Sequence, residues 1–177
     1  NTLSDDLLHF VYGSFKITRA TLSSCYSDCI DVDYALGDLS NLLIKYAGND
    51  GLDFMTSTST LEGIEIRTVG DKGISIGEKS QIEATKIAIY EAQDGISVKD
   101  DSSLKLHNSQ LVNNKTAISI YKKNWRYGKP GSLEGREIHF SGNDVSLSVE
   151  KGGVLKLYGQ PLPDRRHGDG TVVTDDN

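Results

Sequence analysis

The sequence predicts an all-β fold, a single-stranded right-handed parallel β-helix with about 22 residues per coil and about seven coils. A four-residue word with apolar second and fourth residues recurs at a fixed interval, and a second alternating segment lies about midway through each unit. Alternation with period two is typical of a strand with one buried face. No unit has room for a helix of ten or more residues, and the Leu/Asn frame of a leucine-rich repeat is missing.

The repeated words begin at residues 29, 51, 73, 95 and 117, where the chain reads CIDV, GLDF, GISI, GISV and AISI. One step of 22 residues upstream gives LLHF at 7, and SLSV at 146 follows after one repeat plus a seven-residue insertion. We expect two inward stacks, because equivalent positions of a solenoid lie above one another. They are Ile30, Leu52, Ile74, Ile96 and Ile118, and Val32, Phe54, Ile76, Val98 and Ile120.

Each word follows a stretch of Gly, Asn and Asp, such as GNDG at 48–51. We expect these stretches to form the turns, because Gly and Asn tolerate positive φ and Asp can bond its own backbone.

The chain of 177 residues is the size of one domain, and 37 % hydrophobic residues are ordinary for a folded protein. We assign residues 1–160 to the β-helix, with a loop insertion at 121–131, and residues 161–177 to a polar, flexible tail. Neither a run of about 18 apolar residues nor a signal peptide is visible, so we expect no membrane span and a segment of a larger polypeptide. A net charge of −6 argues against nucleic acid as a partner.

Two cysteines occur, Cys25 and Cys29. With no second pair and no nearby histidine, a zinc site is a poor interpretation. Two small thiols in a turn and a disulfide of an exported protein both remain open.

An acidic column is expected on the outer surface, because the third residues of five successive words are Asp31, Asp53, Ser75, Ser97 and Ser119. Asp33 points to the same face, and Asp28 and Asp50 precede their strands. Carboxylates this close repel one another unless they are solvated, paired with Lys45 or Lys72, or bridged by a hard cation. As a metal site, the sequence suggests Asp31, Asp33 and Asp53 with Ca²⁺.

The same carboxylates also permit a catalytic interpretation, because acids on adjacent coils resemble the paired carboxylates of glycoside hydrolases. A lyase needs a cation or base near a uronate, and Lys72, Lys99 and Lys122 are available, although they fall in different columns of the repeat. His107 and His139 are isolated in the sequence and are expected to be surface or turn residues.

The insertion at 121–131 interrupts the period and is therefore expected to leave the solenoid as a loop. It combines rings and cations without an acid, so the sequence suggests a site for anionic glycans. The candidate residues are Tyr121, Lys122, Lys123, Trp125, Arg126 and Tyr127, with Lys129 nearby. The structural alternative is that the aromatic side chains fold back over the coil beneath, with Tyr121 continuing its strand.

Several segments resemble the β-helix that follows the kinase-like domain in bacterial spore-coat CotH-type proteins. The resemblance covers about residues 5–160, and GDKGISIGEKS at 70–80 is its most specific stretch. It implies the fold and an extracellular or cell-envelope setting, and it carries over no catalytic residue.

We therefore expect a non-catalytic domain of a larger protein that presents loops to a polysaccharide or to other domains of the same polypeptide. The alternative is a polysaccharide lyase or glycoside hydrolase that acts on an acidic polysaccharide through the face of Asp31 and Asp53.

Overall fold

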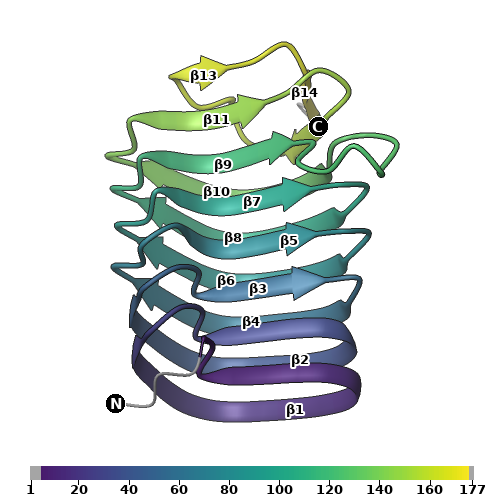
Figure 1. Cartoon of the computed structure of the whole chain (residues 1–177). Helices are drawn as coiled ribbons and strands as arrows, with labels where there is room; N and C mark the ends of the chain where they lie inside the picture. Colours follow the sequence, from purple (N-terminus) through teal and green to yellow (C-terminus); the bar gives the residue numbers. More distant parts are fainter. Residues whose placement is uncertain (1–4, 176–177) are drawn as a thin grey trace.

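The computed structural model describes residues 5–175 and is a parallel β-solenoid of about seven turns, with about 22 residues per turn and no helix in that range (Figure 1). The predicted fold class is confirmed. No helix long and apolar enough to cross a membrane occurs among the described residues. Residues 1–4 of the predicted domain and residues 176–177 of the predicted tail lie outside the described range.

The first two strands each follow most of a coil, and later coils are divided into two strands. The strands are β1 (Leu8–Cys25), β2 (Ile30–Ala47), β3 (Leu52–Met55), β4 (Thr58–Arg67), β5 (Lys72–Gly77), β6 (Gln81–Tyr90), β7 (Asp94–Lys99), β8 (Ser103–Val112), β9 (Thr116–Tyr121), β10 (Ser132–Ser141), β11 (Val145–Val149), β12 (Val154–Tyr158), β13 (Arg166–His167) and β14 (Thr171–Asp175).

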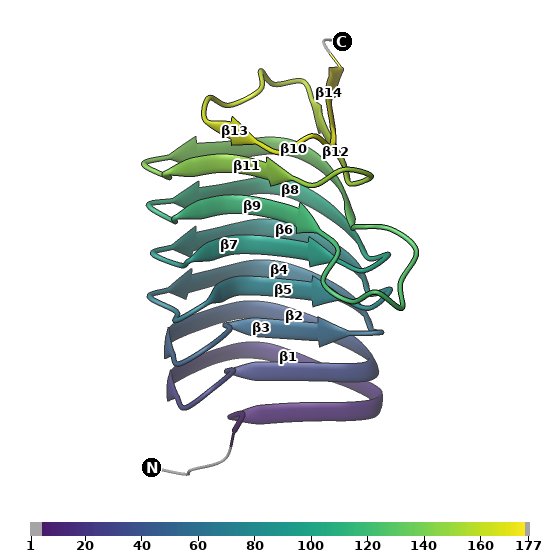
Figure 2. The same cartoon turned by 45° about the horizontal axis from the view of Figure 1, so that its top comes forward.

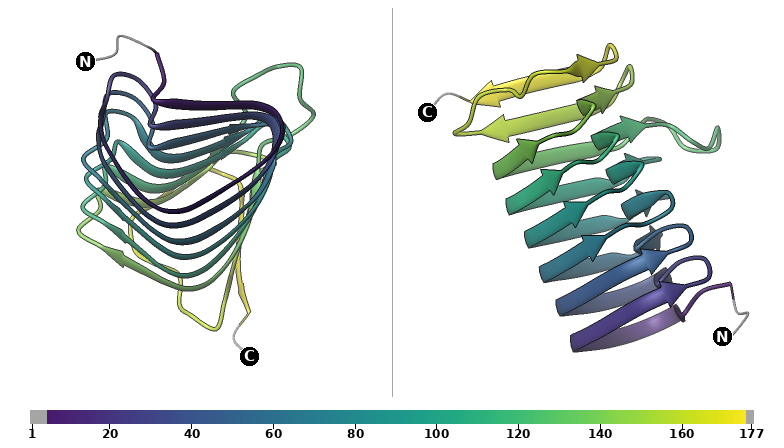
Figure 3. Two further views of the ribbon diagram at one scale, coloured as in Figure 1. Left: turned by 90° about the horizontal axis from the view of Figure 1, so that it is seen from below. Right: turned by 90° about the vertical axis from the view of Figure 1, so that its left-hand side faces the viewer.

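Two parallel sheets result from this division (Figures 1 and 2). The front sheet contains β3, β5, β7, β9, β11 and β13, and the back sheet contains β4, β6, β8, β10, β12 and β14. Strand β2 belongs to both, because residues 30–33 pair with β3 and residues 36–45 pair with β4. The side view in Figure 3 shows the coils stacked along one axis.

Both predicted inward stacks are confirmed by the register and by burial. Ile30 pairs with Leu52, Leu52 with Ile74, and the series continues through Ile96 to Ile118. Every member of the two stacks is at most 1 % exposed. Burying a side chain of this size contributes about 1.5–3 kcal/mol, so the stacks are the main source of stability.

The coil bends where residues at equivalent positions of successive coils have a left-handed backbone conformation, with positive φ. One such column lies within the long strands of the back sheet and contains Asn41, Gly63, Lys86, Asn108 and Glu137, all with positive φ. Successive coils therefore bend at equivalent positions, which gives the angular cross-section in Figure 3. Gly and Asn suit this conformation best, whereas a long side chain in it costs roughly 1 kcal/mol.

The glycines of the turns preceding the words serve a different purpose from the predicted one. Gly48 and Gly70 do not have positive φ. A Cβ on Gly48 would lie 2.0 Å from the carbonyl oxygen of Tyr26, and one on Gly70 would lie 2.1 Å from that of Gly48. Glycine is required at these positions because neighbouring coils approach closely at the turns.

A disulfide joins Cys25 and Cys29 across the turn between β1 and β2, with their Cα atoms 5.2 Å apart. Of the two possibilities left open by the sequence, free thiols or a disulfide, the structure contains the disulfide.

The segment after residue 160, for which the sequence suggests a polar, flexible tail, contains two short strands. Strand β13 pairs with β11, and β14 pairs with β12 over residues 171–175. The reason is that Val172 and the residues around it continue the alternating pattern, and Val172 packs against the end of the core.

Candidate functional site

The outward column on the front sheet is in register along the solenoid. From the N-terminal coil onward it contains His9, Asp31, Asp53, Ser75, Ser97, Ser119 and Ser148. The serines point away from the core, yet Ser75 and Ser97 have no exposed surface. Longer side chains of neighbouring positions cover them, so this end of the column is a buried polar layer.

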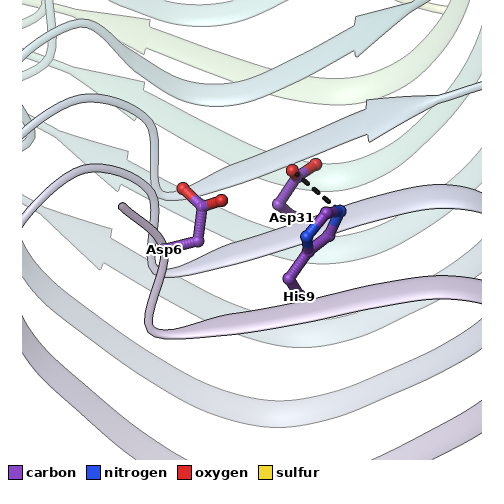
Figure 4. Close-up of side chains that lie close together, drawn as sticks. All are labelled: Asp6, His9 and Asp31. Carbon is purple, nitrogen blue, oxygen red and sulfur yellow. Dashed lines mark ion pairs between the residues drawn. The ribbon is translucent and has the colours of Figure 1, made fainter. Parts of the chain in front are cut away.

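The N-terminal end of the column brings a histidine against carboxylates (Figure 4). His9 Nε2 lies 3.2 Å from Asp31 Oδ2 and 3.0 Å from Asp33 Oδ2. One ligand atom from each of Asp6, His9 and Asp31 lies within 4.8 Å of the others. Sequence reasoning missed His9, although it lies 22 residues before Asp31, in the third position of the first word.

Burial and neighbouring groups raise the pKa values of Asp31 and His9. Burial, and then the charge of Asp33, raise the pKa of Asp31 to about 7. The hydrogen bond to Asp33 raises the pKa of His9. Asp31 and Asp33 of the predicted metal set therefore both contact His9, whereas Asp53 lies on the next coil, paired with Asp31 in the sheet.

Asp28 and Asp50 hold successive turns together. Asp28 Oδ1 accepts the backbone N–H of Asp50 at 2.7 Å, and Asp50 Oδ1 accepts that of Lys72 at 2.9 Å. These bonds link neighbouring coils and differ from the local turn bonds expected for Asp. Burial raises the pKa of Asp50 to about 7, with smaller contributions from Asp53 and Asp28, although the Lys72 ammonium 3.8 Å away opposes the shift.

Lys99 covers the middle of the column. Its side chain extends over Gly77, where a Cβ would lie 3.3 Å from Lys99 Cε, and its ammonium donates to Ser75 Oγ at 2.7 Å. Burial lowers the pKa of Lys99, while the nearby Asp53 partly offsets this effect. Of the three lysines considered for a lyase, Lys99 alone contacts the column directly, since Lys72 pairs with Asp71 and Asp50 and Lys122 begins the loop after β9.

Tyr121 covers the C-terminal end of the buried polar layer. Ser97 and Ser119 both donate to Asp94 Oδ2, at 2.9 and 2.7 Å. Tyr121 hydrogen-bonds Ser97, and burial raises the pKa of its hydroxyl. Tyr121 is the last residue of β9, in agreement with the alternative in which it continues its strand. Its side chain therefore mainly covers the buried serines of the column.

The loop at 122–131 projects from the solenoid between β9 and β10 (Figures 1 and 3). Two adjacent carboxylates from the coil below fix its backbone. Asp100 Oδ1 accepts the N–H groups of Lys123 and Asn124 at 2.8 and 2.9 Å. Asp101 accepts those of Gly128 and Lys129 at 2.9 and 3.2 Å. The base of the loop is thereby held on both sides.

Trp125 stands at the exposed part of this loop, with 82 % of its surface accessible. The Arg126 guanidinium lies 5.7 Å from the centroid of its ring. Tyr127 is half-buried, with the Lys79 ammonium 6.0 Å from its ring centroid. The alternative in which the rings fold back over the coil therefore applies to Tyr121 and in part to Tyr127, but not to Trp125.

A separate groove of about 810 Å³ runs along the back sheet across several coils. Its walls are two outward columns, one containing Asp38, Thr60, Glu83, Lys105 and Glu134, and the other Ser40, Glu62, Thr85, His107 and Arg136. Opposite charges on adjacent coils pair, as in Lys105 with Glu83 at 2.6 Å. His107 is thus a groove residue, and His139 is exposed on β10 outside it.

Residues 9–160 match the family model described as the right-handed β-helix region. The chain belongs to the right-handed β-helix family. The match covers all seven repeated words apart from Leu7 and Leu8, the first two residues of the first word. The family is right-handed, as the sequence predicted for this solenoid. Comparison of this β-helix with curated proteins finds no significant match.

Proposed function

We propose that this β-helix is a non-catalytic extracellular or envelope-associated domain that binds acidic glycans through the loop at 122–131. The observation that carries the proposal is the 82 % exposed Trp125 on a loop whose backbone is fixed by Asp100 and Asp101. A flat apolar ring held in water on an ordered loop is suited to stacking on the apolar face of a sugar.

The charge of the loop supports an acidic ligand. Lys122, Lys123, Arg126 and Lys129 lie within eight residues that contain no acid, in a chain of net charge −6. Lysine and arginine pair with carboxylate or sulfate groups, and arginine does so with two parallel hydrogen bonds. Because these cations are at the surface, their attraction should be screened by salt.

Two observations support the proposed location. The Cys25–Cys29 disulfide is typical of an oxidising compartment. The resemblance to CotH-type proteins suggests the same setting, and other domains of the same polypeptide are then partners of this one.

The groove on the back sheet is a second candidate surface for an extended polysaccharide. It is elongated along the solenoid axis, hydroxyl and carboxylate groups recur on its walls from coil to coil, and Arg136 adds a guanidinium group. Such groups suit the hydroxyls of a linear glycan. Tyr158, with the Arg136 guanidinium 5.0 Å from its ring centroid, lies at the C-terminal end of this groove.

The catalytic alternative on the face of Asp31 and Asp53 ranks second. In its favour, the pKa of Asp31 is raised to about 7, as a general acid requires. Against it, the Lys99 ammonium is buried against Ser75, and the 810 Å³ groove lies on the other sheet. A uronate polymer incubated with the protein would give an unsaturated-product absorbance or new reducing ends if this alternative were correct.

Affinity electrophoresis in gels containing polygalacturonate or a neutral β-glucan tests the proposal. Trp125→Ala should reduce retention by both polymers, because burying such a ring is worth about 1.5–3 kcal/mol. Lys122→Ala with Lys123→Ala should reduce retention by the acidic polymer only.

Matched controls are Tyr26→Ala, which removes another exposed ring, and Lys115→Ala with Lys151→Ala, which removes two exposed charges elsewhere. Retention unchanged in the loop variants but lost in Arg136→Ala would transfer the site to the groove. Retention unchanged in all of them would overturn the proposal.

A further inference from the structure

We infer that Asp6, His9 and Asp31 form a binding site for a divalent transition-metal ion such as Zn²⁺, with Asp33 within reach as a fourth ligand. The site lies on the outer surface of the first two coils, where His9 of β1 is stacked beneath Asp31 of β2 and Asp6 precedes β1 (Figure 4). It is independent of the proposed glycan loop.

The geometry requires little movement to hold an ion. One ligand atom from each of Asp6, His9 and Asp31 lies within 4.8 Å of the others. The ligand atoms of a tetrahedral ion with bonds of about 2.0–2.2 Å to nitrogen and oxygen lie about 3.3–3.6 Å apart. Side-chain rotations that bring these atoms about 1 Å closer together would therefore close the site. The parallel pairing of His9 with Asp31 keeps the two side chains adjacent.

The contacts of His9 Nε2 point to an ion at this position. Two carboxylate oxygens, from Asp31 and Asp33, lie 3.2 and 3.0 Å from this one nitrogen. A ring nitrogen carries at most one proton, so it cannot give both oxygens a full hydrogen bond. A metal ion between the nitrogen and the oxygens would bind all three atoms at once.

The charge balance also favours a cation. The carboxyl groups of Asp6, Asp31 and Asp33 lie around His9, and Asp53 adds a fourth one coil along, paired with Asp31 in the sheet. A divalent ion would offset the repulsion among these carboxylates.

The imidazole decides the class of metal. Ca²⁺ and Mg²⁺ prefer oxygen ligands, whereas nitrogen together with carboxylates suits Zn²⁺ and its first-row neighbours. The inferred site therefore differs from the calcium site suggested by sequence in its metal and in its members, since it gains Asp6 and His9 and leaves Asp53 outside.

Isothermal titration calorimetry of the whole chain with ZnCl₂, MnCl₂ and CaCl₂ tests this inference. We expect one Zn²⁺ per chain, tighter than Ca²⁺ by at least tenfold, and reversal by EDTA. His9→Gln and Asp31→Asn should each weaken Zn²⁺ binding by at least tenfold. His139→Gln, which removes an exposed histidine of the back sheet, should not change it.

Circular dichroism of each variant establishes that it folds, and the absorption spectrum of Co²⁺ bound to the unaltered protein gives an independent readout. Nitrogen and oxygen ligation in that spectrum supports the site. Equal Zn²⁺ affinity in His9→Gln, tighter binding of Ca²⁺ than Zn²⁺, or no saturable binding of either ion would overturn it.

Discussion

Replacement of Asp100 by alanine should release the loop that carries Trp125. Asp100 is 1 % exposed and accepts two backbone N–H groups of the loop, from Lys123 and Asn124. Hydrogen bonds to a charged group contribute about 1.5–3 kcal/mol each. Alanine would also occupy the left-handed conformation of residue 100, where φ is 51°, at a cost of roughly 1 kcal/mol. Allowing for partial recovery through water, we expect the loop to lose about 3 kcal/mol.

That loss should raise the population of the open loop about 100-fold, since each 1.4 kcal/mol is a factor of ten. Trypsin provides the assay, because the loop contains Lys122, Lys123, Arg126 and Lys129 and cleavage follows the open population when opening is fast. Mass spectrometry assigns each cut to the loop or to another segment.

Asp100→Asn is the matched variant, because asparagine tolerates positive φ and keeps one acceptor oxygen without the charge. It should fall between the unaltered protein and Asp100→Ala in cleavage rate. Asp144→Ala, at an exposed turn away from the loop, should have no effect. Rapid cleavage of the unaltered loop, or equal rates in all variants, would refute the view that Asp100 orders it.

Three further predictions concern stability, measured by chemical denaturation. Ile96→Val should lower the free energy of unfolding by about 0.5–1.5 kcal/mol, and Ile96→Asp by more than about 4 kcal/mol; equal losses would contradict full burial of this position. The pKa of Asp50 in the folded protein is about 7, against an ordinary value of 3.8. The stabilisation that protonated Asp50 adds to the free energy of unfolding is therefore fully present below pH 4 and is lost as the pH rises to 7. Asp50→Asn should flatten that dependence by up to about 4 kcal/mol, and an unchanged pH profile would contradict this. Reduction of Cys25–Cys29 should cost only about 2 kcal/mol, because the bridge closes a very short loop, and unfolding on reduction would contradict it.

The repeated words were sufficient to predict the solenoid, because a 22-residue period with inward residues such as Ile74 and Ile76 leaves few ways to bury them. They also predicted the outward column of Asp31, Asp53 and Ser75, since the same period fixes which residues lie side by side. The same rule applied once more would have found His9.

The remaining features depend on where side chains extend, which the period does not determine. Nothing in the spacing indicates that Lys99 extends across Gly77 to Ser75, or that Tyr121 covers Ser97. The groove on the back sheet depends on the curvature of strands that bend at residues such as Asn41. The strand pairing after residue 160 could not be predicted, because β13 has only two residues and gives no repeat signal.

The glycan proposal is tested most directly by the fluorescence of Trp125, which is the only tryptophan of the chain. Titration with an oligogalacturonate should shift its emission to shorter wavelength and shield it from iodide, because an 82 % exposed ring would become covered by sugar. The shift should weaken with added salt, as the contacts of the loop cations are screened. If calorimetry detected saturable binding of the same oligosaccharide while the emission and the quenching of Trp125 stayed unchanged, the ligand would bind elsewhere and the account would be contradicted.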